Sequence, residues 1–141
     1  MSDTHYTTYT IAVHLDLSAD PPNQLVLNDN PRIPHGTIGI LAWVASPNSD
    51  PFDFLRPEFC ATKQPPPIAI PVLRGPAMVT LVSNLESSDV GTWAYRIGVR
   101  PTAEPGKPVW TPDCLDAYPQ PNDDYQAFMA VSGPIIINTG V

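Results

Sequence analysis

Four aspartates lie close together in a proline-rich part of the chain: Asp113, Asp116, Asp123 and Asp124. Carboxylate oxygens are the ligands that hard cations prefer, and Ca²⁺ takes about six to eight oxygens from a pliable loop. The spacing of the four aspartates matches no known calcium-binding loop, and an acidic loop is usually only hydrated. We therefore predict no metal site and no cofactor, and a Ca²⁺ role for this segment stays open as the alternative.

Aromatic side chains accompany these carboxylates. Sugar-binding modules use exposed aromatic faces beside carboxylates and amides, because a sugar ring presents apolar C–H faces and many hydroxyl groups. A lectin-like site of this kind would lie in the segment 101–125. Its candidate ligand-binding residues are Trp110, Asp113, Asp116, Tyr118, Asn122, Asp124 and Tyr125. The competing interpretation is that Trp110 covers an edge of the fold, since large aromatic residues are mostly buried.

Residues that support nucleophilic catalysis are scattered along the sequence. A Ser-His-Asp or Cys-His arrangement brings a nucleophile, a base and an orienting group together. His5, His14 and His35 precede Cys60 and Cys114, and no local motif joins them. We expect His14 to be a solvated residue on the polar face of a strand, and no cationic neighbour in sequence would lower the pKa of Cys60. We therefore predict no catalytic residue and no enzyme, with a small hydrolase as the outside alternative.

Composition limits the partners and the compartment. The formal net charge is −7 with only seven Lys plus Arg, and such a surface repels the phosphate backbone of nucleic acids. No apolar run reaches the roughly 18–20 residues that a membrane helix needs, and no secretory signal is visible at the start. We expect a cytoplasmic protein, unless a signal-independent route exports it. Cys60 and Cys114 are then expected to be reduced, and a disulfide between them stays open as the alternative.

The elements that must position these residues are strands. The 19 prolines disfavour long helices, because each ring removes a hydrogen-bond donor and clashes with the preceding turn. In the stretch Ser87–Arg100, four large residues alternate with polar or small ones: Trp93, Tyr95, Ile97 and Val99. This period of two is typical of a β-strand with one face in a core.

Further strands follow along the chain. Residues 9–17 alternate in the same way, whereas residues 37–45 are apolar on both faces, which is typical of a central strand covered on both sides. Phe52 and Phe54 are expected in the core. More strands are expected at 24–27, 68–73, 77–83, 125–131 and 135–137, with a surface excursion over 101–122. We therefore predict a single all-β domain over residues 1–141, built as one antiparallel β-sandwich.

The segment Asp89–Tyr95, with the sequence DVGTWAY, resembles the corner motif of immunoglobulin-type sandwiches. Trp93 takes the place of the corner aromatic, Tyr95 that of the second core cysteine, and Trp43 resembles the core tryptophan of such domains. The cysteine pair of antibody domains is missing here. The resemblance therefore implies an immunoglobulin-like sandwich architecture and nothing finer.

The same strand is similar to the copper-ligand strand of cupredoxins. In that family a cysteine ends the strand, and a histidine and a methionine follow within about ten residues. Ile97 stands roughly in the place of that cysteine, and no histidine follows His35. This resemblance implies a cupredoxin-like fold without copper.

A third resemblance, to small bacterial β-sandwich proteins, covers more of the chain. Some of those proteins are grouped with the bacterial inclusion-body proteins, which often close on Asp-Pro-Ile-Ile. The resemblance rests on four segments: the opening strand, residues 36–38 leading into the Trp43 strand, the strand 91–95, and the closing GPIIIN at 133–138. In the closing segment Gly133 stands in place of the aspartate. It implies an architecture and little chemistry.

Binding is the function class that remains. Open sandwiches have edge strands, which pair with other chains unless they are blocked, and prolines are typical blocks. The uncharged strand Ile135–Ile137 is expected to pair within the fold or across a two-fold dimer. We therefore predict a non-catalytic binding or structural module with a protein partner or a second copy of itself, and carbohydrate binding is the alternative.

Overall fold

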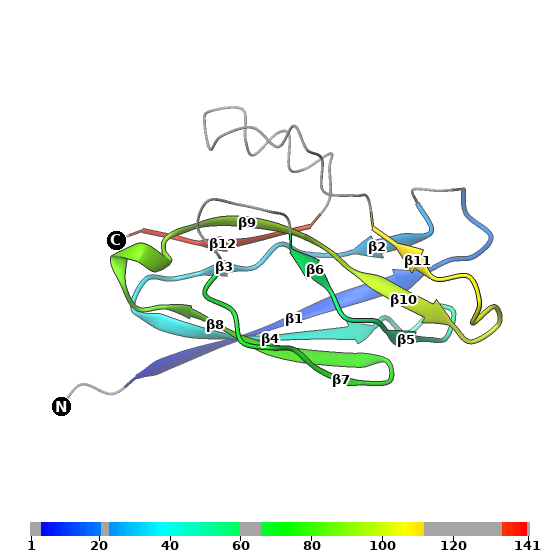
Figure 1. Cartoon of the computed structure of the whole chain (residues 1–141), viewed down its shortest axis with the longest axis horizontal. Helices are drawn as coiled ribbons and strands as arrows, with labels where there is room; N and C mark the ends of the chain where they lie inside the picture. The colour runs from blue at the N-terminus through cyan, green and yellow to red at the C-terminus, as the bar shows by residue number, and fades with distance from the viewer. Residues whose placement is uncertain (1–3, 21–22, 60–65, 112–133, 141) are drawn as a thin grey trace.

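The computed structural model describes residues 4–20, 23–59, 66–111 and 134–140 (Figure 1). Nearly all regular structure in these residues is β-strand, so the predicted all-β class is confirmed. In chain order the elements are β1 (His5–Leu15), β2 (Leu25–Leu27), β3 (Arg32–Ile33), β4 (Thr37–Ala45), β5 (Phe52–Phe54), β6 (Glu58–Phe59), β7 (Val72–Arg74), β8 (Ala77–Asn84), the 3₁₀ turn η1 (Ser87–Asp89), β9 (Gly91–Arg96), β10 (Gly98–Pro101), β11 (Val109–Trp110) and β12 (Ile135–Asn138).

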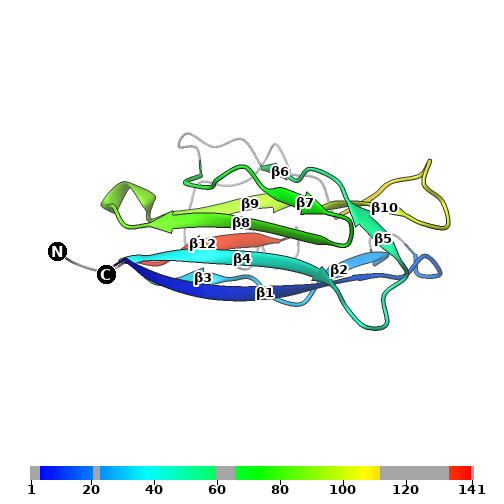
Figure 2. The ribbon, with the colours of Figure 1, turned by 90° about the horizontal axis from the view of Figure 1, so that it is seen from below.

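The first layer is a five-stranded sheet in the order β2-β1-β4-β8-β7. β1 and β4 run parallel, with His5 opposite Thr37 and Val13 opposite Ala45. The other three pairs in this sheet are antiparallel. Figure 2 shows β1, β4 and β8 lying side by side as the long strands of this layer.

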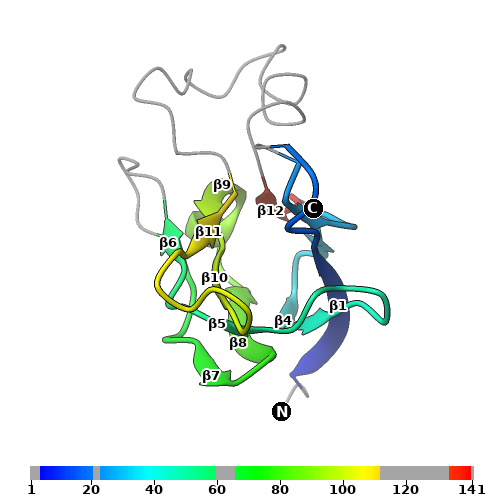
Figure 3. The same cartoon turned by 90° about the vertical axis from the view of Figure 1, so that its right-hand side faces the viewer.

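The second layer contains the strand orders β3-β12-β9-β6 and β11-β10-β5. Because β10 follows β9 directly along the chain, the two groups form one continuous layer. Seen end-on, the two layers curve around a common interior (Figure 3). β12 runs parallel to β3 and antiparallel to β9.

The predicted purely antiparallel sandwich is therefore wrong, because both layers are mixed. The segment between β1 and β4 is long enough for a crossover, which parallel neighbours require. It passes through β2 at the edge of the first layer and β3 at the edge of the second before β4 returns beside β1. The alternation of side chains fixed the buried faces but not the direction of the neighbouring strand.

Alternating residues of both layers form one core. The predicted inward face of β1 is confirmed, since Ile11, Val13 and Leu15 are fully buried. Phe52 and Phe54 are also in the core, as predicted, with their rings edge to face at 5.1 Å. The remaining members of the core are Leu25, Ile33, Leu41, Trp43, Met78, Val82, Tyr95, Ile97, Val99 and Ile136.

β4 occupies the centre of the first layer, as its sequence predicts, but only one of its faces is fully covered. Leu41 and Trp43 point inward and are buried, whereas Ile38, Ile40 and Val44 on the opposite face are half-buried. The expectation that both faces are covered is therefore wrong for the described chain. Among the described residues, neighbouring strands of the same sheet flank the outward side chains of β4.

The two layers meet at Trp43 of β4 and Tyr95 of β9. The Trp43 Nε1–H donates a hydrogen bond of 3.1 Å to the Tyr95 hydroxyl, and the two rings pack edge to face at 5.9 Å. Phe59 of β6 lies against the other side of this pair, 5.7 Å from the Tyr95 ring. The predicted core positions of Trp43 and Tyr95 are thus confirmed, and the two residues are direct partners.

The strand predicted within the stretch Ser87–Arg100 is divided at Ile97 into β9 and β10. The Ile97 N–H donates to Thr111 Oγ1 at 2.9 Å, and the Ile97 carbonyl accepts from the Thr111 N–H at 2.9 Å. The Ile97 N–H thus binds a side-chain oxygen instead of a backbone carbonyl. On one side of this point β9 pairs with β12, and on the other side β10 pairs with β11. Local alternation carries no sign of this change of partner.

Two other predicted strands differ in outcome. The strand predicted over 68–73 is reduced to β7, with Ile68 forming a single bridge to Val82. Pro71 has no N–H to donate, and Thr80 Oγ1 binds the Ala69 carbonyl at 2.7 Å, so the ladder is interrupted between them. The strand Ile135–Ile137 forms β12, which lies between β3 and β9. It pairs within the fold, one of the two arrangements expected for it.

Two buried asparagines join the layers at the end opposite the β4–β5 turn. Asn84 of β8 donates from Nδ2 to the carbonyls of Ile33 and Thr139, at 2.8 and 3.0 Å. Asn138 of β12 donates from Nδ2 to the carbonyls of Ser83 and Asp89, at 2.9 and 2.8 Å. Each layer thus places one amide on the backbone of the other, which fixes their relative position.

Candidate functional site

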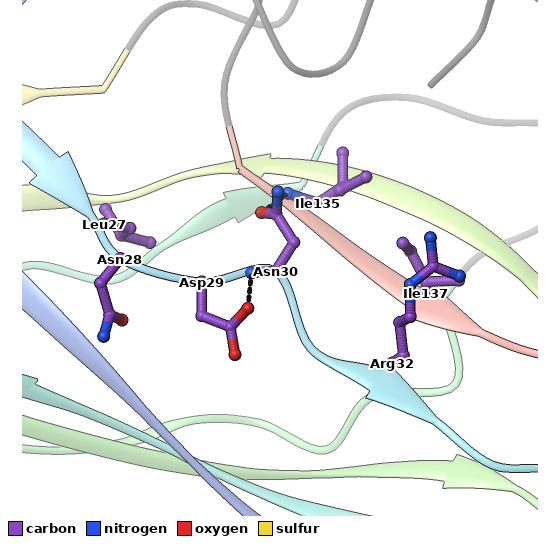
Figure 4. Close-up of a pocket in the computed structure, with 7 residues that line it drawn as sticks. All are labelled: Leu27, Asn28, Asp29, Asn30, Arg32, Ile135 and Ile137. Carbon is purple, nitrogen blue, oxygen red and sulfur yellow. Dashed lines mark hydrogen bonds between the residues drawn. The ribbon is translucent and has the colours of Figure 1, made fainter. Parts of the chain in front are cut away.

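A polar pocket opens where the β2–β3 connection passes β12 (Figure 4). Its volume is about 350 Å³. Aliphatic side chains of β2 and β12 and polar side chains of the connection line it: Leu27, Asn28, Asp29, Asn30, Arg32, Ile135 and Ile137. The pocket therefore combines an aliphatic wall with amide, carboxylate and guanidinium groups.

The connection is held in place by its own side chains. Asn28 Oδ1 accepts a hydrogen bond of 2.8 Å from the N–H of Ala12 in β1. Asn30 Oδ1 accepts one of 3.1 Å from the N–H of Ile135 in β12. Asp29 Oδ1 accepts one of 2.8 Å from the N–H of the next residue, Asn30. The connection is thus tied to both layers, which orders its polar groups before any ligand binds.

The side chains of the connection divide between two sides. Figure 4 shows Asn30 and Arg32 on the side of β12, beside Ile135 and Ile137, whereas Asn28 and Asp29 point away from β12. Asn30 accepts the Ile135 bond through Oδ1, and its Nδ2 provides two N–H donors. The β12 side of the pocket therefore offers N–H donors next to an aliphatic surface.

Tyr9 supports the wall of the pocket from β1. Its hydroxyl donates a hydrogen bond of 2.6 Å to the carbonyl of Arg32 in β3. Burial raises the pKa of Tyr9, and a hydrogen bond with Thr7 opposes that rise. The phenol therefore stays protonated at neutral pH and remains a donor to the backbone of β3.

Trp110, from the predicted ligand-binding set, lies in β11 opposite Gly98 of β10. Its half-buried ring covers Gly98 so closely that a Cβ there would stand 2.5 Å from the ring. The Arg96 guanidinium carbon lies 4.5 Å from the ring centroid, and Arg96 also forms an ion pair of 3.1 Å with Glu58. The protein's own groups therefore engage this ring, as the edge-covering interpretation of Trp110 expects.

The other residues of that predicted set lie outside the described residues: Asp113, Asp116, Tyr118, Asn122, Asp124 and Tyr125. The same is true of Cys60, Cys114, Asp123 and the strand predicted over 125–131. Within the described ranges, no group of three or more His, Cys, Asp or Glu side chains is placed to hold a metal ion.

The histidines contact different partners. His14 is half-buried rather than fully solvated, and its Nδ1 lies 2.9 Å from the Ser46 Oγ. His35 Nδ1 lies 3.4 Å from Asn84 Oδ1, at the other end of β4. In the part of the chain that the structure describes, no carboxylate hydrogen-bonds to the His14 ring, so the orienting member of a catalytic triad is not found there.

The pocket was not among the sequence-based candidates. The run Asn28-Asp29-Asn30 is typical of a turn, and the sequence shows no link between it and β12, which lies more than 100 residues away along the chain, as the separation of Asn30 and Ile135 shows. The one available signal is the density of polar side chains just before Arg32. That signal alone does not distinguish a binding site from an ordinary turn.

Comparison with known proteins adds no relative. No protein-family model matches this chain, and no curated protein matches it in sequence. Among the described residues, no helix has the length and apolar character needed to cross a membrane. The resemblances to immunoglobulin-type, cupredoxin and inclusion-body proteins therefore stay predictions.

Proposed function

We propose that this protein is a non-catalytic binding module whose ligand is a small polyhydroxylated molecule, such as a sugar, held in the pocket between the β2–β3 connection and β12. The proposal includes an open β-sandwich of immunoglobulin-like or cupredoxin-like type as its scaffold. The observation that carries it is a set of polar side chains, fixed by hydrogen bonds to both layers, beside the aliphatic side chains of β12.

The chemistry of the lining suits a ligand with many oxygens. Among the described residues that line the pocket, Arg32 carries a guanidinium and lies on the β12 side, whereas the carboxylate of Asp29 points away from β12. On the β12 side, Asn30 Nδ2 and the guanidinium N–H groups of Arg32 are suited to donate to hydroxyl oxygens. Ile135 and Ile137 contact C–H surface. A pocket of this kind, concave with a few fixed polar groups, is the usual form of a small-molecule site.

A glycan array followed by titration calorimetry tests the proposal. The protein is expected to bind a restricted set of glycans, and Arg32→Gln is expected to weaken that binding by about tenfold, since a hydrogen bond from a charged donor contributes roughly 1.5–3 kcal/mol. Arg56→Gln is the matched control, because Arg56 is also exposed but lies between β5 and β6, away from the pocket. Binding that is equal in both variants would exclude the pocket as the site.

The segment that contains Trp110 is a second candidate location for sugar binding. If the segment 101–125 forms the sugar site, Trp110→Ala abolishes binding and Arg32→Gln leaves it unchanged. The opposite result assigns the ligand to the pocket. The hydrolase alternative is addressed separately by the contact between His14 and Ser46: turnover of generic esters that is lost in His14→Ala would replace the binding proposal with a catalytic one.

A further inference from the structure

Most side chains on the outward side of the five-stranded sheet are apolar. The alternation and register of its strands place one set of side chains on this outer face: Tyr6, Thr8, Thr10, Ala12, His14, Val26, Ile38, Ile40, Ala42, Val44, Val72, Arg74, Ala77, Val79, Leu81 and Ser83. Tyr6 and Val72 are each 59% exposed, Leu81 43% and Val79 41%. Figure 2 looks toward this sheet, and no described strand lies in front of it.

The sheet contains no carboxylate. Not one residue of β1, β2, β4, β7 or β8 is Asp or Glu, although the chain has 14 acidic residues and a net charge of −7. Arg74 and His14 are the basic residues of the outer face, and both lie near strand ends. An exposed sheet face is normally polar, with apolar side chains on the core side alone. This face departs from that pattern along its central strands.

We propose that the outer face binds the same face of a second copy of this chain, forming a two-fold dimer in which two sheets pack face to face. Two copies that each carry seven net negative charges repel one another over about a Debye length, roughly 8–10 Å at physiological salt. The acid-free sheet is the face on which they approach without placing carboxylates against carboxylates. A two-fold axis makes the contact self-complementary, so the neutrality of one face suffices for both.

The size of the face fits this partner. β1, β4 and β8 have 11, 9 and 8 residues; at about 3.3 Å per residue and 4.8 Å between strands they cover roughly 400 Å² in plan. With the edge strands β2 and β7, two copies bury about 1,000 Å² or somewhat more, the lower bound for a specific interface. Apolar patches of several hundred Å² on a soluble protein mark such contacts.

The double-sided apolar pattern of β4 supports the same conclusion. Ile38, Ile40 and Val44 are the residues for which the sequence predicts a cover, and no described element supplies it. A second sheet packed at about 10 Å would bury them, as in the interior of a sandwich. A dimer of four layers, in which both faces of β4 are covered, therefore accounts for the apolar residues on both faces of this strand.

Light scattering coupled to gel filtration tests the dimer on the full chain. The expected mass is twice that of one chain at tens of micromolar protein, and it should persist in high salt because the contact is apolar. Val79→Glu places a charge on the outer face and is expected to give the monomer mass. Val90→Glu is the matched control, because Val90 is the same residue type with 39% exposure against 41% for Val79, and it lies off this sheet, between η1 and β9.

A second variant tests whether misfolding, rather than loss of the contact, explains a monomer mass. Thr10→Glu changes an exposed polar residue opposite Ala42, removes little packing within the chain, and is also expected to give a monomer. Circular dichroism establishes that both variants keep the β spectrum. A parent protein that stays monomeric, a monomer that instead sediments with phosphatidylcholine vesicles, or a dimer that survives both Val79→Glu and Thr10→Glu would each overturn the proposal. The result is independent of ligand binding in the pocket.

Discussion

Replacing Tyr95 by phenylalanine removes a single oxygen from the contact between the two layers. That oxygen accepts the hydrogen bond of 3.1 Å from Trp43 Nε1, and the two side chains are only 2% and 1% exposed. The Tyr95 ring keeps its edge-to-face contact with Trp43 and its contact with Phe59. The variant therefore leaves an indole N–H buried without its partner and alters the packing very little.

The free energy of unfolding is expected to fall by about 2 kcal/mol in Tyr95→Phe, roughly a 30-fold change in the equilibrium constant, because an unpaired buried donor costs about 1–3 kcal/mol. Trp43→Phe removes the donor and also opens a cavity, which adds about 24 cal/mol per Å³. Its loss should be larger. In the double variant neither polar group remains, so its loss should be smaller than the sum of the two single losses by about 1 kcal/mol.

Urea denaturation at fixed protein concentration, followed by circular dichroism, measures these differences. Thr102→Val is the control: Thr102 is exposed and lies outside the five-stranded sheet, and a surface change of this kind stays within about 0.5 kcal/mol. If Tyr95→Phe were as stable as the parent, or if the two single losses simply added in the double variant, the buried hydrogen bond would not stabilise the contact between the layers.

The same tyrosine makes stability depend on alkaline pH. Burial raises the pKa of Tyr95 far above its ordinary value of 10.0, with a smaller opposing effect from the Trp43 hydrogen bond. The folded protein thus holds this proton more tightly than the unfolded chain. Its contribution is complete below about pH 10, the ordinary tyrosine pKa, and is lost as the pH rises further. Tyr95→Phe should flatten that alkaline decline in urea experiments, and an unchanged slope would contradict the assignment.

Three further predictions concern other contacts. Gly98→Ala brings a Cβ within 2.5 Å of the Trp110 ring, so the ring must move. We expect the free energy of unfolding to fall by about 1–3 kcal/mol and the tryptophan emission to shift. No change in either quantity would refute the close packing of Trp110 on Gly98. Asn84→Ala removes both amide bonds to the second layer and should cost about 2–4 kcal/mol in urea denaturation, whereas a neutral result would mean that the layers dock without them. Hydrogen bonds from the Ser18 hydroxyl and N–H lower the pKa of Asp16. The stabilising effect of the Asp16 carboxylate is therefore present above its ordinary pKa and is lost as the pH falls through the lowered value. Ser18→Ala should raise the Asp16 pKa measured by NMR titration, and an unchanged midpoint would exclude Ser18 as the cause.

Periodicity predicted the buried faces well, for a physical reason. Successive side chains in a strand point to opposite faces, so the large residues at Ile11, Val13 and Tyr95 identify the inward side without knowledge of the partner strand. The same logic placed Tyr95 in the core, whereas Trp43 was placed there by its resemblance to the core tryptophan of immunoglobulin-type domains. It did not show that they touch, because the distance between strands in space is not encoded in the alternation of either one.

The neighbour of each strand and its direction were harder to predict from the sequence. The parallel pairing of β1 with β4 depends on the path of the chain through both layers. The break at Ile97 depends on a single hydroxyl, that of Thr111. The pocket depends on Asn30 reaching the backbone of Ile135. In the last two cases one side chain binds the backbone of another segment, an interaction that leaves no periodic trace in the sequence.

The position of β12 determines when this protein is able to fold during synthesis. It is the last described strand, yet it lies between β3 and β9, so the facing edges of those two strands stay without a partner until residues 135–138 have left the ribosome. At about 5–20 residues per second this interval lasts roughly two to eight seconds after β9 is made. Exposed strand edges are where chains pair wrongly, so the facing edges of β3 and β9 are the part of this fold most open to wrong pairing during that interval.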